Sequence, residues 1–170
     1  MRHTLLVLPF FMAGPVFAAP ERLSDGQIVE VLETVNEGEI DAATIARDRA
    51  QNPAVQQFAK DMQAQHQTNK KDTKELAKQN KIDDKDSGLA DALEKEADAL
   101  NKTLKRAQLN GFDKVYMAQQ VAMHEKALST LRDNLIPFAQ SDALKTHLEK
   151  TAAAVAMHLE HAKKLQSELK

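Results

Sequence analysis

Apolar residues recur every three or four positions through most of this 170-residue chain. That spacing places them on one face of an α-helix. No stretch of the sequence shows the two-residue alternation of a β-strand with comparable strength. Aromatic residues make up only 4% of the chain, so its core must consist mainly of Ala, Leu, Val, Ile and Met. That composition suits helices better than sheets. The sequence therefore predicts an all-α protein.

Residues that cap or break helices divide the chain into segments. Ser24 and Gln27 form a capping-box pattern, which predicts a first helix from about Asp25 to Arg49. Pro53 is well suited to the first turn of a second helix, which fades within the polar residues 78–88. Because the join between these two helices is short, we expect them to form an antiparallel hairpin.

A second hairpin should follow a crossover segment. Residues 89–109 form a less hydrophobic helix, which Gly111 is expected to end or kink. A further long helix then runs to Pro137, and Ser141 caps the last one. Four long amphipathic helices with one long crossover predict a ferritin-like four-helix bundle rather than an up-and-down one. We expect residues 24–169 to form this single domain.

The first residues are expected to lie outside the bundle. Arg2 precedes an apolar run from Leu5 to Met12 and then small residues, the pattern of a secretory signal peptide cleaved after Ala18. The apolar run is shorter than the roughly 18 residues that a membrane span requires. We therefore predict a signal peptide over residues 1–18, Gram-negative-type export to the periplasm or the medium, and no transmembrane segment in the mature chain.

Charge and cysteine content exclude several classes of function. The formal net charge is −2, with acidic and basic residues interleaved, which argues against a nucleic-acid partner. The chain has no Cys, so a disulfide framework, a thiolate metal site and a cysteine nucleophile are all excluded. An envelope protein as partner stays open, as does the oligomeric state.

Each of the four long helices carries one ionisable residue inside its apolar stripe. These residues are Glu39, His66, His124 and His158. A buried charge costs several kcal/mol unless it is paired, so such residues are normally excluded from a core. A carboxylate and three imidazoles converging from four helices would suit one divalent ion such as zinc, copper or iron. The pattern thus predicts a metal site, with His161 as an additional candidate ligand.

Counting residues from the expected joins tests this convergence. Glu39 and His66 lie at similar depth, whereas His124 lies about four residues, roughly 6 Å, nearer to its join than His158. The same pattern also fits a structural polar core, in which a Glu39–His66 ion pair fixes helix register in an envelope interaction module. An enzyme with His124 or His158 as general base is a third alternative, for which no nucleophile or substrate pocket is identified.

Four stretches of the chain resemble a bacterial secreted family. They read "GEIDAATIA", "NPAVQQFAKDMQAQH", "GFDKVYMAQQVAMHEKAL" and "HLEHAKKL". The family is a domain of unknown function (DUF4142), described as ferritin-like and often labelled a predicted outer membrane protein. The resemblance covers about Ser24 to Leu165, implies the fold and the exported compartment, and includes the same four ionisable positions. Many members have Asp where this chain has Gln65, which removes a carboxylate near the site.

Overall fold

The computed structural model describes residues 22–169, which form helices and no strand. The helices are α1 (Asp25–Arg49), α2 (Pro53–Asn80), α3 (Gly88–Arg106), α4 (Leu109–Thr130), the π-helical turn η1 (Leu131–Leu135) and α5 (Asp142–Glu168). The prediction of an all-α helical bundle is therefore confirmed. The signal peptide predicted over residues 1–18 lies outside the described residues. Among the residues described, none of the helices has the length and apolar character needed to span a bilayer.

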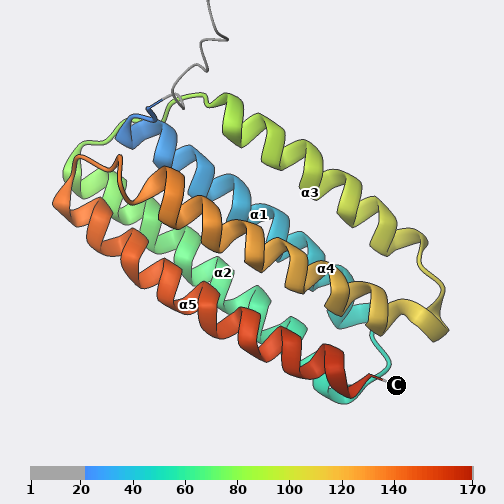
Figure 1. Cartoon of the computed structure of the whole chain (residues 1–170). Coiled ribbons are helices and arrows are strands. Elements are labelled where there is room, and N and C mark those ends of the chain that lie inside the picture. Colours follow the sequence, from blue (N-terminus) through green and yellow to red (C-terminus); the bar gives the residue numbers. More distant parts are fainter. Residues whose placement is uncertain (1–21, 170) are drawn as a thin grey trace, which may run out of the picture.

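Four helices form the bundle and the fifth lies against its outside (Figure 1). α1 pairs with α2 and α4 pairs with α5, as the two predicted hairpins require. α3 packs chiefly on α1 and carries the chain from one hairpin to the other. Because this crossover spans the length of the bundle, α2 and α4 run in the same direction. Each of the four bundle helices is therefore antiparallel to the two bundle helices beside it.

Side-chain caps set the predicted helix starts. Ser24 and Gln27 form the capping box, in which the backbone N–H of Ser24 donates to Gln27 Oε1 at 3.0 Å. Asn52 Oδ1 accepts from the N–H of Ala54 at 2.8 Å, with Pro53 between them in the first turn of α2. Ser141 caps α5 in the same way. These three starts agree with the sequence prediction.

Two carboxylates hold the reversals of the two hairpins. Asp113 accepts from the backbone N–H groups of residues 51 and 52 at 3.0 and 2.8 Å. Asp25 accepts from the backbone N–H groups of residues 140 and 141 at 2.8 and 2.9 Å. Each carboxylate belongs to a helix of the other hairpin, so these contacts fix the axial position of one hairpin against the other.

The break expected at Gly111 occurs earlier, and that prediction is wrong. α3 ends before residues 107–108, and Gly111 lies in the first turn of α4. The guanidinium of Arg49 donates hydrogen bonds of 2.5 to 2.7 Å to the carbonyl oxygens of Leu104, Lys105 and Ala107. A continuous helix needs its carbonyl oxygens for the N–H groups of the next turn. Their capture by Arg49 ends α3 at this point.

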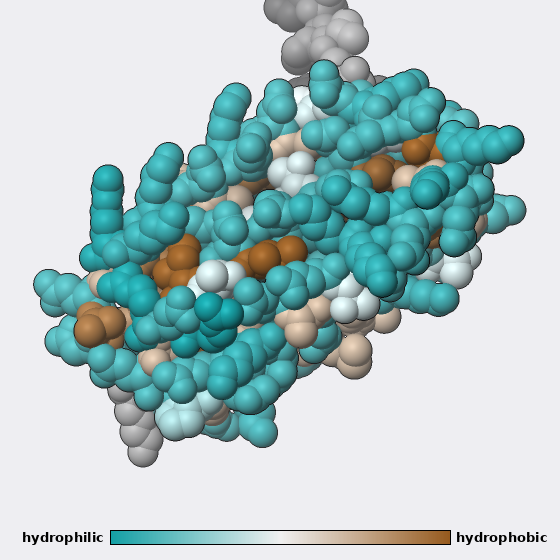
Figure 2. All heavy atoms as spheres, turned by 180° about the vertical axis from the view of Figure 1, so that it is seen from behind, coloured by the Kyte–Doolittle hydropathy of each residue, from teal (hydrophilic) through white to brown (hydrophobic). Residues whose placement is uncertain are grey.

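The interior of the bundle consists of two apolar clusters with a polar layer between them. The cluster toward the α1–α2 join includes Phe58, Met62, Phe112, Tyr116 and Met117. The cluster toward the α4–α5 join includes Ile28, Leu32, Leu135, Leu144 and Leu148. The buried residues of the polar layer are Asn36, Glu39, His66, Gln120, His124 and His158. Outside, apolar side chains show as patches recessed between hydrophilic ones (Figure 2).

Candidate metal centre

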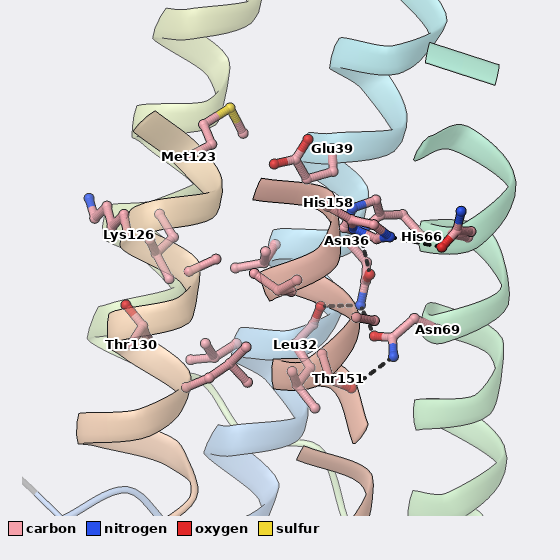
Figure 3. A pocket seen from close by; sticks show the side chains of 18 of the residues that line it. Leu32, Asn36, Glu39, His66, Asn69, Met123, Lys126, Thr130, Thr151 and His158 are labelled. Carbon is pink, nitrogen blue, oxygen red and sulfur yellow. Dashed lines mark hydrogen bonds between the residues drawn. The ribbon is translucent and has the colours of Figure 1, made fainter. Parts of the chain in front are cut away.

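Three histidines from three helices meet in the polar layer. His66 of α2, His124 of α4 and His158 of α5 are all buried, and one nitrogen from each ring lies within 4.8 Å of the other two. The centroids of the rings are 5.4 to 5.9 Å apart. Figure 3 shows His66 and His158 next to one another, with Glu39 nearby. Three of the four residues from the apolar stripes thus form one cluster.

His124 and His158 lie at the same level because the chain reverses later than the sequence suggested. Helical hydrogen bonds continue beyond α4, from Ile136 N to Leu131 O at 2.9 Å and from Ala139 N to Leu135 O at 3.0 Å. The reversal is therefore confined to the few residues before Ser141, the N-cap of α5. The ring centroids of His124 and His158 lie 5.4 Å apart, so the axial offset of about 6 Å counted from the expected join is not present.

The ring of His66 is held in one tautomer. Its Nδ1 lies 2.9 Å from Asn36 Oδ1. The amide nitrogen of Asn36 donates to Leu32 O at 2.7 Å and to Asn69 Oδ1 at 2.8 Å, so its Oδ1 is the atom that accepts from His66 (Figure 3). Because Nδ1 carries the proton, Nε2 of His66 carries a lone pair.

The other two rings are held in the same manner. His124 Nδ1 donates to the backbone oxygen of Gln120 at 2.9 Å, and His158 Nε2 donates to Gln65 Oε1 at 2.8 Å. The remaining nitrogens, His66 Nε2, His124 Nε2 and His158 Nδ1, are buried and have no hydrogen-bond partner among the described residues. The cluster therefore contains three buried ring nitrogens that no hydrogen-bonding group of the described chain uses.

Burial favours the neutral form of His66 and of His158. It lowers the pKa of His66 well below its ordinary value of 6.5, and the nearby His124 and His158 rings lower it further. Burial likewise lowers the pKa of His158 to about 4, with smaller contributions from His124 and His161. Neutral imidazole is the form of histidine that binds metal ions, so this environment favours a ligand over a proton.

Glu39 lies on the Nδ1 side of His124, away from the three ring nitrogens that have no partner among the described residues. Its carboxylate is buried, with Oε1 3.6 Å from His124 Nδ1 and Oε2 accepting from Gln120 Nε2 at 2.9 Å. Nδ1 is the nitrogen of His124 that already carries a proton. Within residues 22–169, His124 is the one basic side chain in ion-pair range of this carboxylate. The ion pair considered between Glu39 and His66 does not form, because His66 bonds to Asn36 instead.

His161 lies apart from the cluster. Its side chain is exposed on α5, and its ring meets the edge of the Phe58 ring with 5.2 Å between centroids. The group of nitrogens that could share a metal ion contains His66, His124 and His158 but not His161. The structure thus separates this candidate from the other three histidines.

The acceptors behind the rings are functional residues that reasoning from the sequence missed. Asn36 lies three residues before Glu39 and four after Leu32, so an inward amide could have been found by the same spacing. Gln120 lies four residues before His124 and could have been found in that way too. Gln65 lies next to His66 in the chain but bonds to His158, and no periodic signal marks it.

A cavity of about 490 Å³ lies beside the histidines. Residues of all five α-helices and of η1 line it, and His66, His158 and Glu39 are among them (Figure 3). Much of the remaining wall is apolar, formed by Val31, Leu32, Val35, Leu93, Leu100, Leu131, Leu135 and Val155. The imidazoles of the cluster therefore adjoin a space large enough for a small molecule.

Comparison with known proteins adds a family and no activity. Residues 13–165 match the family described as a domain of unknown function (DUF4142), a range that includes every residue of the cluster. Neither a curated protein nor a solved structure matches the chain. The ferritin-like character expected from the sequence stays a prediction, and any function must be argued from the geometry of the site.

Proposed function

Because the chain belongs to the DUF4142 family, whose description names no activity, we propose a function from the site: the protein binds one divalent metal ion through His66, His124 and His158. The observation that carries this proposal is the set of three buried ring nitrogens that have no hydrogen-bond partner within residues 22–169. A buried polar atom left unpaired costs about 1–3 kcal/mol. A metal ion shared by three such nitrogens would remove that cost three times.

The spacing of the rings supports a shared ion. Zinc–nitrogen bonds of about 2.0–2.1 Å in a tetrahedral site place the ligand nitrogens roughly 3.4 Å apart. One nitrogen from each ring lies within 4.8 Å of the other two, so each such nitrogen has to move by less than about 1 Å to reach this geometry. Side-chain rotation alone supplies such a shift.

The residues behind the rings support the same reading. Metal-bound histidines usually donate their second ring N–H to a carbonyl, a carboxylate or water, which fixes the tautomer and the orientation. All three rings make such a bond, to Asn36, to the Gln120 backbone and to Gln65. The buried carboxylate of Glu39 faces His124 from behind, so a cation on Nε2 would balance its charge.

Three imidazole ligands fit zinc, copper or iron in the divalent state. Three protein ligands also leave at least one coordination position open. We propose a role in metal binding, buffering or stress protection rather than in turnover. The signal-peptide pattern of residues 1–18 places this role in the periplasm or outside the cell as part of the proposal.

Equilibrium dialysis with metal analysis tests the proposal. We expect the purified protein to retain one zinc, copper or iron ion per chain and His66→Ala to retain almost none. His161→Ala is the matched control, because it removes an exposed imidazole outside the cluster and should leave the metal content unchanged. Metal contents that are near zero in the unmutated protein, or equal in all three proteins, would contradict a site at these residues.

A further inference from the structure

We propose that the cavity beside the three histidines binds a small amphiphilic carboxylate. Its apolar chain would lie in the cavity, and its carboxylate would take the open position of the metal ion. This inference rests on the proposed metal site and names the class of ligand that completes it. Size, lining, charge balance and access support it.

The size of the cavity exceeds what packing normally leaves. Protein interiors are close-packed, with few voids larger than a water molecule. A space of about 490 Å³ instead falls within the range of roughly 300–1,000 Å³ that is typical of small-molecule sites. It opens in the polar layer and extends along the apolar cluster that includes Leu32 and Leu135.

The lining of the cavity is mostly apolar, with imidazoles and Glu39 at one level and the hydroxyls of Thr130 and Thr151 at another. Branched aliphatic side chains of α1, α3, η1 and α5 form the wall, including Val31, Leu100, Leu131 and Val155. His66, His158 and Glu39 contribute polar atoms. Figure 3 shows the two imidazoles together near Glu39, while Thr130 of α4 is drawn at another level. A ligand that matches this lining is apolar along its length and polar at one end.

Charge balance favours an anionic head group. A divalent ion held by three neutral imidazoles carries two positive charges, and the carboxylate of Glu39 behind His124 offsets one of them. One positive charge would remain buried, and an uncompensated buried charge is costly. A ligand oxygen with a single negative charge removes it. A hydroxide ion would also do so, but it would leave the apolar wall without contacts.

The edge of the cavity can admit such an anion. The exposed side chains of Lys126 of α4 and Lys150 of α5 line this edge. The carboxylates of Glu96 and Asp72 line it too. Lys126 pairs with Glu96 of α3 across the seam between α3 and α4. These two helices make little other contact, since α3 packs chiefly on α1. The edge therefore carries balanced charge, and among the described residues Lys126–Glu96 is the ion pair that crosses the seam between α3 and α4.

Cobalt-loaded protein provides the test, because the visible absorption of cobalt(II) changes when a ligand enters its coordination sphere. We expect decanoate to change this spectrum at a concentration at least about tenfold lower than acetate, since only decanoate buries methylene groups in the cavity. 1-Decanol, which has the same chain without the negative charge, should bind more weakly than decanoate and leave the spectrum unchanged.

Variants separate the cavity from the metal site. Ala127→Phe fills the cavity from α4 and replaces none of the proposed ligands, and should weaken decanoate binding at least about tenfold while one cobalt ion per chain is retained. Ala118→Phe, on the exposed face of the same helix, is the matched control and should change neither. Should Ala127→Phe not fold, the smaller change Ala154→Leu on the α5 wall serves the same purpose.

The outcomes are distinguishable. Metal analysis before any ligand is added shows whether the chain holds cobalt, and a chain without cobalt would overturn both proposals. A cobalt-loaded protein whose spectrum responds equally to decanoate and acetate, or does not respond, would overturn the ligand inference and leave the metal site standing. Undiminished decanoate binding by a folded Ala127→Phe variant would also place the ligand outside this cavity.

Discussion

At the scale of single residues, the site depends on the acceptors behind the histidines as much as on the rings. An imidazole presents one lone pair, and the hydrogen bond on its other nitrogen decides which nitrogen that is. Asn36, the Gln120 backbone and Gln65 supply these bonds from α1, α4 and α2. The groups that orient the three rings therefore belong to α1, α2 and α4, and none of them belongs to α5.

Gln65 offers the cleanest test of this orientation, because it is exposed and its loss should not disturb the core. Gln65→Ala removes the acceptor for His158 Nε2, and we expect metal affinity to fall about 10- to 100-fold. Gln65→Glu keeps an acceptor and adds a negative charge, so its affinity should equal or exceed that of the unmutated protein. Competition against a coloured chelator measures all three.

Gln67→Ala is the control for that series, since it removes another exposed glutamine of α2 two residues further along, outside the hydrogen bonds of the cluster. Its metal affinity should match that of the unmutated protein. If Gln65→Ala binds as tightly as Gln67→Ala, the hydrogen bond to His158 does not orient the ring for a ligand.

The sequence identified the rings of the site but not the contacts that orient them. His66, His124 and His158 each interrupt an apolar stripe, and the cost of burying an ionisable group makes such an interruption informative. Glu39 interrupts a stripe as well, yet it lies behind His124. The helical period predicts that Glu39 faces inward. On which side of the His124 ring its carboxylate lies depends on how one helix is rotated about its axis relative to the next.

At the scale of the helices, α1 and α3 approach one another closely at Gly38. A Cβ atom on Gly38 would lie 2.7 Å from the Cβ of Ala97, nearer than real Cβ atoms approach. Asn101 of α3 donates to the backbone oxygen of Gly38 at 3.4 Å beside this contact. Gly38 thus lets α3 lie directly on α1, where it covers the cavity.

Gly38→Ala should therefore destabilise the protein, although alanine favours helices. The helix propensity gains up to about 1 kcal/mol, while the overlap with Ala97 costs about 1–3 kcal/mol, so we expect a net loss of about 1–2 kcal/mol. The free energy of unfolding in urea measures it. Adding Ala97→Gly to the variant frees the space and should restore part of the loss.

Gly111→Ala is the matched control for Gly38→Ala. Gly111 lies in the first turn of α4, and no atom lies within 4 Å of a Cβ placed there. We expect this variant to be as stable as the unmutated protein or more stable by up to about 1 kcal/mol. Equal free energies of unfolding for the two glycine variants would show that α3 is not held at Gly38.

Helix starts were predictable from the sequence where local chemistry decides them, as at Ser24, Pro53 and Ser141. The boundary between α3 and α4 was not, because Arg49 of α1 sets it from far away in the chain. The late reversal before α5 depends in the same way on Asp25 at the start of α1. A capping pattern involves residues within four positions of one another in the sequence. The α3–α4 boundary and the reversal before α5 depend instead on tertiary contacts.

At the scale of the whole molecule, the bundle carries a stability cost at its centre. A polar layer with three unpartnered ring nitrogens separates its two apolar clusters. The layer contributes less to folding than an apolar one of equal size, because unpaired polar atoms lose their hydration without replacement. The metal-free protein should therefore gain stability when an ion binds, since a ligand that binds only the folded state stabilises it.

The same layer makes the metal-free protein sensitive to acid. The folded state holds the pKa of His158 at about 4 and that of His66 well below 6.5, whereas both rings take up protons near pH 6.5 once unfolded. Between about pH 6.5 and pH 4 the unfolded state thus binds more protons, and stability falls as the pH falls. From His158 alone we expect a loss of about 1–2 kcal/mol between pH 7 and pH 5.

Urea unfolding with a chelator present, at pH 7 and at pH 5, measures that loss. His158→Gln removes one of the two imidazoles whose pKa is lowered in the folded state. The free energy of unfolding of this variant should therefore depend less on pH than that of the unmutated protein. His161→Gln removes the exposed neighbour one turn away, whose contribution to the His158 pKa is smaller than that of burial, and should keep most of the dependence. If both variants lose stability equally between the two pH values, the acid sensitivity arises from carboxylates elsewhere and not from the buried histidine layer.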